Sequence, residues 1–228
     1  MYFLDYYYFI WVLPAMVLMI IAQISVKTTF SKYSKKACNV TGAEAARQVL
    51  QVNGVSGVKI ERVSGNLTDH FDPRANVIRL SDAVYDSNSV AAAGVAAHEA
   101  GHAVQHATNY APIVIRQAII PVCQFGSNLA IPLVLAGLLF SFYPLAYAGI
   151  ILFGAAVFFQ LVTLPVEFNA SSRAVQALDE SGVLSDGGLR ASKKVLRAAA
   201  LTYVAALFVS LANMLRLVLL VSGRRRND

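Results

Sequence analysis

The sequence is poor in charged residues, and long stretches have none. Asp, Glu, Lys and Arg make up 14% of the 228 residues, whereas 57% are hydrophobic. No charged residue occurs between Tyr6 and Val26 or between Gln117 and Val166. This composition is too apolar for an ordinary soluble domain. It indicates a protein whose surplus of apolar residues lies in a lipid bilayer.

Cysteine is also scarce, and this excludes two kinds of site. The chain has only Cys38, beside a basic stretch, and Cys123, within an uncharged stretch. Neither a disulfide framework nor a zinc site built from cysteine is therefore available.

The first apolar stretch lacks the basic segment and the cleavage site of a signal peptide, so we expect a retained membrane anchor. Aromatic residues near its start suit the membrane interface, or plain hydrophobic filling. They are Tyr2, Phe3, Tyr6, Tyr7, Tyr8, Phe9 and Trp11.

The uncharged stretches predict four membrane-spanning helices. A span needs about 20 apolar residues. Residues 6–26 therefore predict one span, and residues 117–166 predict two, with a turn near Ser141 to Pro144. A fourth candidate, Ala198 to Val221, is apolar apart from Arg216, whose long side chain can reach the headgroups.

These spans divide the chain into five parts. The parts are an N-terminal anchor (1–26), a polar part with a histidine-rich helix (27–116), a membrane hairpin (117–166), a second polar part (167–197) and a last span with a basic tail (198–228). Because a hairpin joins the two polar parts, both must lie on the same side of the membrane.

The placement of basic residues predicts which side that is. The two polar parts contain ten and five Lys and Arg residues. By the positive-inside rule, this bias places them in the cytoplasm, at the cell membrane. Arg224, Arg225 and Arg226 argue for the opposite orientation, or for a last segment that does not fully cross. Basic flanks beside anionic lipid explain the net charge of +6, so no nucleic-acid partner is expected.

The first polar part has patterns of both helices and strands. Thr41 is placed to cap a helix over residues 42–52. Strand-like stretches follow at 58–63, 67–71 and 76–80, and the last two predict a hairpin. An alanine-rich helix is expected from Val90 to about Thr108. The predicted fold class is therefore α+β, a multi-pass helical membrane protein with a small cytoplasmic domain.

The stretch "HEAGHAVQH", residues 98–106, carries a candidate metal site. His98 and His102 are four residues apart on the expected helix, so both imidazoles can bind one ion at about 2 Å. Glu99 lies toward the side where a bound water would sit. This H-E-x-x-H arrangement predicts one Zn²⁺ per chain, with Glu99 as the catalytic base. The alternative is a helix whose histidines are merely solvated or packed.

The third ligand must come from elsewhere in the chain. His106 follows His98 by eight residues, about 12 Å along a helix, so the two cannot share an ion. Of five glutamates, Glu167 is the first charge after the hairpin, at the expected start of a cytoplasmic helix. With the two histidines it would leave the fourth tetrahedral position open for water. The alternative is an acid favoured by the helix dipole.

"HEAGHAVQH", "LPVEFNASSRA" and "TDHFDPRANVIRLSDAVYD" together resemble the YugP-like membrane zinc metallopeptidases, a gluzincin-type family related in layout to the HtpX-like peptidases. The resemblance implies a zincin-like domain, zinc bound by His98, His102 and Glu167, and Glu99 as base. Ser171 departs from the HtpX-like pattern, in which an acid at this position orients a ligand histidine. Asn169, Ser171 or Asp179 can take that role instead.

Other candidate residues surround the expected site. Residues Asn76, Val77, Ile78, Arg79 and Leu80 can form a sheet edge that binds an extended substrate, or an ordinary core strand. Candidates for the oxyanion partner are His70, Tyr85, Tyr110 and Arg173.

The function expected from these features is zinc-dependent endopeptidase activity at the membrane, on peptides or proteins. One alternative is a non-catalytic zinc-binding adaptor or a subunit of a quality-control complex, associated with other membrane proteins. Another is a site-2-type intramembrane protease, but no expected span contains the Asp that such an enzyme needs.

Overall fold

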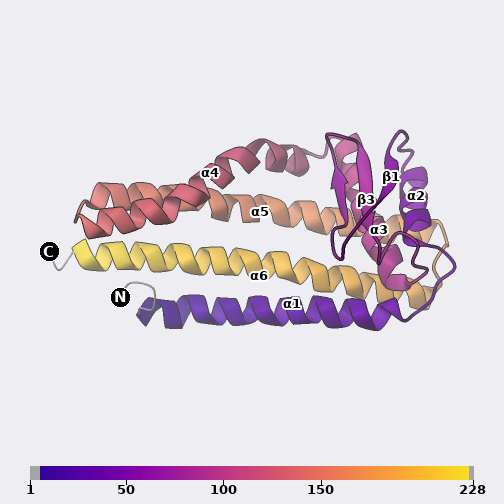
Figure 1. Ribbon diagram of the computed structural model, residues 1–228, viewed down its shortest axis with the longest axis horizontal. Helices are drawn as coiled ribbons and strands as arrows, with labels where there is room; N and C mark the ends of the chain where they lie inside the picture. The colour runs from indigo at the N-terminus through magenta and orange to yellow at the C-terminus, as the bar shows by residue number, and fades with distance from the viewer. Residues whose placement is uncertain (1–5, 226–228) are drawn as a thin grey trace. The chain divides into compact units, whose positions relative to one another are not determined.

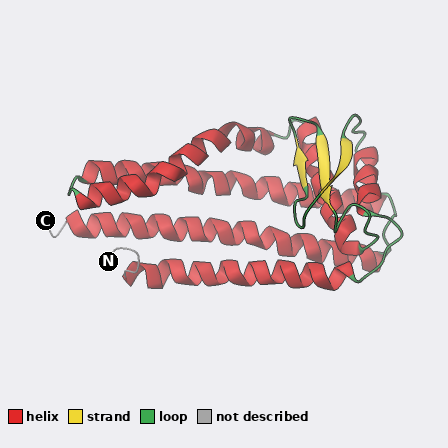
Figure 2. Cartoon of the chain, viewed as in Figure 1, coloured by secondary structure: helices red, strands yellow, loops and turns green. Residues whose placement is uncertain are grey.

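The computed structural model describes residues 6–225 and is mainly helical (Figure 2). Predictions for Tyr2, Phe3 and Arg226 fall outside these residues. Two compact units form within the chain. The first comprises the described residues up to Ala22, Ile115–Leu164 and the described residues from Thr202 onward, and the second comprises Gln23–Val114 and Pro165–Leu201.

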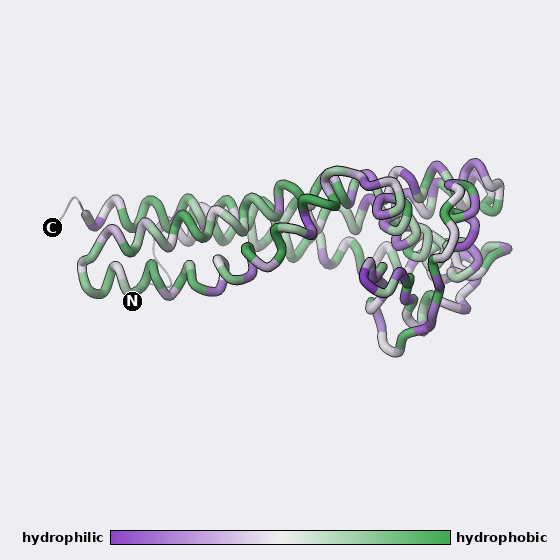
Figure 3. The backbone as a smooth tube through the Cα atoms, turned by 90° about the horizontal axis from the view of Figure 1, so that it is seen from above, coloured by the Kyte–Doolittle hydropathy of each residue, from purple (hydrophilic) through white to green (hydrophobic). Residues whose placement is uncertain are grey.

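Four helices in the described part of the chain are long and apolar enough to cross a membrane, which confirms the predicted number of spans. They are α1 (Leu13–Ser34, preceded by the π-helical turn η1, Tyr8–Val12), α4 (Ala111–Leu139), α5 (Tyr143–Glu180) and α6 (Asp186–Arg225). Hydrophobic residues predominate along much of the length of these helices (Figure 3). Large apolar side chains such as Phe125 and Ile151 are 68% and 75% exposed, as lipid contact requires.

In the first unit, α4 and α5 form the predicted hairpin. Ser141, with φ of 52°, lies in the turn between them. The two helices pack closely because glycines face backbone: a Cβ on Gly149 would lie 2.6 Å from the carbonyl oxygen of Ala130. Pro121 and Pro132 lie inside α4, which bends along its length (Figure 1).

α5 differs from the prediction in one respect that matters for the site. Glu167 was expected at the start of a cytoplasmic helix, but it lies inside α5, which runs unbroken from Tyr143 to Glu180. The expectation was wrong because the residues after Val166 continue the helix: Ala170 and Ala174 are fully buried in it. Dipole stabilisation at a helix N-terminus therefore does not explain this acid.

The second unit contains a small sheet. Its strands are β1 (Lys59–Val63), β2 (His70–Asp72) and β3 (Val77–Ser81), in the order β1-β3-β2. β1 runs parallel to β3, and β2 pairs antiparallel to β3 as the predicted hairpin.

The strand order corrects one prediction. Residues 76–80 were considered as an open edge for substrate, yet β3 is the central strand, paired on both sides, so its main chain is not available for a peptide. β2 is the edge strand on that side.

Two helices of the second unit agree with the sequence patterns. α2 (Gly42–Val52) begins with a capping box, in which Thr41 and Glu44 bond each other's backbone N–H groups. α3 (Val90–Ala107) is capped by Ser89, whose hydroxyl accepts from the Ala92 N–H at 3.2 Å. α2 packs on α3, and the buried core of this unit also includes residues of β3 and α5.

Gly101 sets the spacing between α3 and α5. A Cβ at this position would lie 2.5 Å from the carbonyl oxygen of Ala170, well inside contact distance. α3 also presents mostly alanine at its buried positions, so the α5 backbone can approach its histidines. Close approach of these two helices is therefore a condition for the site described below.

Replacing Gly101 by Ala is expected to destabilise the protein. A helical Gly→Ala change ordinarily stabilises by about 1 kcal/mol, but here the methyl group meets backbone and must push α3 and α5 apart. We expect a cost near the upper end of overpacking effects, about 3 kcal/mol, which exceeds that gain. Thermal unfolding of the purified protein measures this. Gly154→Ala in α5, where nothing lies within 4 Å of a new Cβ, is the matched control. An equal or higher melting temperature for Gly101→Ala would contradict the packing argument.

Candidate metal centre

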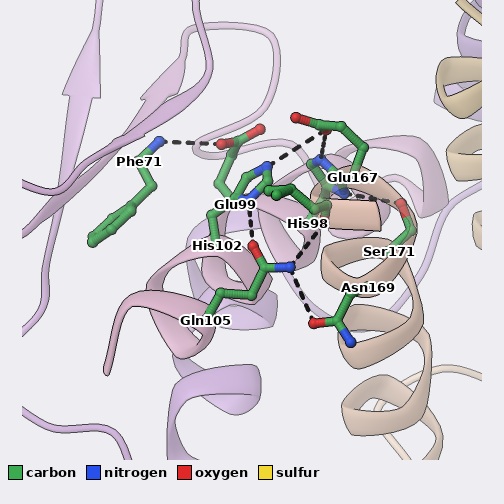
Figure 4. Close-up of polar contacts among 9 residues, drawn as sticks. Phe71, His98, Glu99, His102, Gln105, Glu167, Asn169 and Ser171 are labelled. Atoms are coloured by element: carbon green, nitrogen blue, oxygen red, sulfur yellow. Dashed lines mark hydrogen bonds and ion pairs between the residues drawn. The ribbon is translucent and has the colours of Figure 1, made fainter. Parts of the chain in front are cut away.

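Three side chains from two helices of the second unit converge at one point. His98 and His102 come from α3 and Glu167 from α5 (Figure 4). The Oε2 atom of Glu167 lies 3.2 Å from His98 Nε2 and 3.6 Å from His102 Nε2. One ligand atom from each residue lies within 4.8 Å of the others. The structure thus brings together the residues predicted as ligands, across 69 positions of sequence.

The geometry of the three side chains fits a zinc ion. In a tetrahedral site with bonds of about 2.0–2.1 Å, neighbouring ligand atoms are about 3.3 Å apart. The distances of 3.2 and 3.6 Å match that spacing. Two imidazoles and one carboxylate are also a donor set that zinc prefers, and three protein ligands are the number found in catalytic sites. Such a set leaves one position for water.

The electrostatics of the cluster also favour a cation. Burial lowers the pKa of His102, but its hydrogen bond with Glu167 and the negative charges of Glu99 and Glu167 outweigh burial and raise the pKa above its ordinary value. The cluster of His98, His102 and Glu167 therefore stabilises positive charge beside the Glu167 carboxylate, which is 4% exposed.

Glu99 is held against the edge strand of the sheet. Its Oε2 accepts a hydrogen bond from the backbone N–H of Phe71, in β2, at 3.1 Å (Figure 4). α3 contacts β2 directly. The predicted base is therefore oriented by backbone rather than by a mobile side chain.

Ser171 contacts one of the ligand histidines. Its hydroxyl lies 3.1 Å from His98 Nδ1. Ser171 follows Glu167 by four residues, so both lie on one face of α5. Of the partners considered from sequence, the structure thus places Ser171, and not the exposed Asp179, beside a ligand histidine. A hydroxyl can accept from Nδ1–H and leave Nε2 facing Glu167.

Gln105 holds the other histidine, and sequence reasoning missed it. Its Oε1 lies 3.0 Å from His102 Nδ1, and its Nε2 donates to the Val166 carbonyl at 2.7 Å and to Asn169 Oδ1 at 3.0 Å. Because an amide oxygen only accepts, it fixes the proton of His102 on Nδ1 and leaves Nε2 free to bind metal. The signal in the sequence was a polar residue three positions after His102.

Replacing Gln105 by Leu is expected to lower zinc affinity about 10- to 100-fold, the usual effect of losing a partner of a ligand histidine. Competition with a zinc chelator measures the dissociation constant. Gln176→Leu in α5 is the control, because Gln176 is exposed and bonds only Glu180 among the described residues. Unchanged zinc affinity in Gln105→Leu would show that this contact does not orient His102.

The remaining candidates lie around this centre rather than in it. Arg173 donates through Nε to Asn169 at 2.8 Å and lies 5.9 Å from the Tyr110 ring centroid. Asn169 in turn accepts a hydrogen bond from Gln105, which contacts His102, so Asn169 acts on this histidine only indirectly.

Four further residues singled out from the sequence have other local roles. The Nδ1 atom of exposed His70 lies 2.7 Å from the Thr68 carbonyl oxygen, and Tyr85 packs on the hydrophobic core. His106 packs on the Phe71 ring, at 5.7 Å between ring centroids. Arg79, on the central strand, pairs with Asp72 at 2.8 Å and lowers the pKa of that carboxyl to about 2.

Known proteins are similar to this chain over most of its length. Residues 8–222 match the family described as "Putative neutral zinc metallopeptidase". A protein named "Putative membrane protease YugP", from Bacillus subtilis (strain 168), is 51% identical over 209 residues, which cover 90% of this chain and 93% of that protein. No solved structure matches. The chain therefore belongs to the YugP-like family of membrane zinc metallopeptidases.

Proposed function

We propose that the protein is a zinc-dependent endopeptidase that hydrolyses peptide bonds at the centre formed by α3 and α5. The observation that carries this proposal is the convergence of His98, His102 and Glu167, with Glu99 next to the first ligand in sequence. These three residues would hold the zinc ion, which would supply Lewis-acid chemistry for polarising the scissile carbonyl and for making a neighbouring water more acidic.

Glu99 moves the proton. Its carboxylate takes a proton from the attacking water and gives it to the leaving amine nitrogen as the C–N bond breaks. Because Glu99 Oε2 accepts a hydrogen bond from the Phe71 N–H, we assign the proton transfer to Oε1. Gln105 and Ser171 keep the two imidazoles oriented during turnover.

An extended substrate is proposed to lie along β2. This strand is at the edge of the sheet and carries Phe71, the residue whose N–H holds the base. A peptide that pairs with β2 by main-chain hydrogen bonds would pass close to Glu99. This assignment replaces the central strand considered from sequence.

We further propose that the second unit, with its zinc centre, faces the cytoplasm. The excess of Lys and Arg in residues 27–116 and 167–197 supports this orientation. α3 is not among the four helices that can span a membrane. This argues against the site-2-type alternative, whose motif lies within a span.

Removing zinc tests the proposed function. We expect the purified protein to cleave a quenched fluorescent casein, to lose this activity on treatment with a strong chelator, and to regain it with Zn²⁺ but not with Mg²⁺, which prefers oxygen ligands. Cleavage by protein from which all zinc has been removed would contradict the proposal.

A further inference from the structure

The first unit contains a polar pocket between α4 and α5, within the membrane spans. Its volume is about 550 Å³. Its polar lining comes from Gln124, Ser127 and Asn128 on α4 and Gln160 on α5. The spacing of the α4 residues places them on one face of that helix.

The pocket lies at membrane depth. Gln124 follows Arg116, the last charge before the uncharged stretch, by eight residues, about 12 Å of helix. Gln160 precedes Glu167, the next charge, by seven residues, about 10 Å of helix. The hydrocarbon core of a bilayer is about 30 Å thick. Counted from the hairpin turn, Gln124 precedes Leu139 by 15 residues and Gln160 follows Tyr143 by 17 residues, about 22 and 26 Å of helix. Both amides therefore lie inside the core, nearer to the end opposite the turn.

The amides of this pocket lack partners among the described residues. Ser127 donates to the Cys123 carbonyl at 2.6 Å, and Cys123 donates to the Ala155 carbonyl at 3.3 Å, so these two side chains have partners. No side-chain hydrogen bond joins Gln124, Asn128 or Gln160 to the described part of the chain, and the first two are exposed. Pro132 also removes the usual helical donor to the Asn128 carbonyl.

Such groups require a polar partner in the membrane. Lipid tails offer no hydrogen bonds, and water is absent from the hydrocarbon core. The pocket has no charged lining residue, so its chemistry matches a neutral group that both donates and accepts. An amide or hydroxyl side chain on another transmembrane helix is such a group, and these side chains are known to join helices in membranes.

We propose that this pocket binds the transmembrane helix of a membrane-protein substrate through an uncharged polar residue in that helix. The proposal rests on the proposed peptidase function and names its substrate class. Gln160 of the pocket and Glu167 of the zinc centre belong to one unbroken helix, α5. A substrate bound at the pocket is thereby held on the helix that supplies a zinc ligand. This raises the local concentration, near that ligand, of the polar segment that follows the substrate's transmembrane helix.

Binding of a synthetic single-span peptide tests the proposal. The probe has about 20 Leu and Ala residues, one Asn placed at the depth of the pocket and a fluorophore, and its matched partner has Leu in place of Asn. The assay uses the Glu99→Gln protein in lipid nanodiscs, so that the peptides are not cleaved while binding is measured. The Asn peptide is expected to bind about 3- to 20-fold more tightly than the Leu peptide. Replacing Gln124, Asn128 and Gln160 together by Leu should bring this ratio to about one.

Controls separate the possible outcomes. Asn213→Leu in α6, where Asn213 donates to its own helix at 2.9 Å, should keep the preference for the Asn peptide. If the triple variant does not fold, Gln160→Leu alone should reduce the ratio. An unchanged ratio in a folded variant would overturn the proposal. Chemical crosslinking between copies of the chain is measured on the same variant. If the variant no longer crosslinks to itself while the ratio of peptide affinities is unchanged, the proposal is overturned and the pocket is a contact between copies. Casein cleavage by the wild-type protein tests the peptidase function independently.

Discussion

Replacing Glu99 by Gln is expected to abolish peptide cleavage while zinc content stays at one ion per chain. The amide has the size of the carboxylate and its oxygen can still accept from the Phe71 N–H, so the fold is expected to persist. It cannot take a proton from water, and loss of a general base costs about 10²- to 10⁴-fold in rate. Casein cleavage and metal analysis on the same preparation measure both quantities.

The control for this variant is Glu180→Gln, an exposed acid at the end of α5, which should keep full activity. Cleavage that survives in Glu99→Gln would show that the mechanism is wrong. If the wild-type protein binds zinc but cleaves nothing, and Glu99→Gln behaves identically, the non-catalytic adaptor alternative is favoured. A purely structural zinc site has no need for a base beside it.

Replacing Glu167 by Ala is expected to remove zinc from the protein. This carboxylate is 4% exposed and is the only acid that the described part of the chain places with the two histidines as a metal-binding group. Its loss should weaken zinc binding by more than the 100-fold upper value for residues that only orient ligands. Chelator competition gives the dissociation constant.

Two further variants make the Glu167 result specific. Glu180→Ala, on the same helix, should bind zinc like the wild type. Glu167→Gln keeps the size of the buried side chain, so a loss of zinc there is not a consequence of a cavity. Wild-type zinc affinity in both Glu167 variants would remove this residue from the site.

The parts of the structure that depend on local pattern were predictable. The cap at Thr41 is a short-range signal, and it marks the start of α2. The four spans follow from length and hydropathy alone. Glu167, which the structure places beside the two histidines, stood out in the sequence because few acids exist and it follows the hairpin directly.

The parts that depend on contacts between distant segments were not predictable. The order β1-β3-β2 is set by pairing of strands across the sheet, and nothing within residues 76–80 indicates that β3 is central. The role of Gln105 requires that Val166 and Asn169 lie across from it, which only the packing of α3 on α5 establishes. The same packing gives Gly101 its importance.

The most direct test of a zinc centre shared by α3 and α5 is X-ray absorption at the zinc edge of the purified protein. The expected spectrum shows two imidazole nitrogens and oxygen ligands at about 2.0–2.2 Å, with no sulfur. In Glu167→Gln, the wild-type oxygen environment should be lost together with tight binding. A sulfur ligand at about 2.3 Å, or more than two imidazoles, would contradict the ligand set of His98, His102 and Glu167.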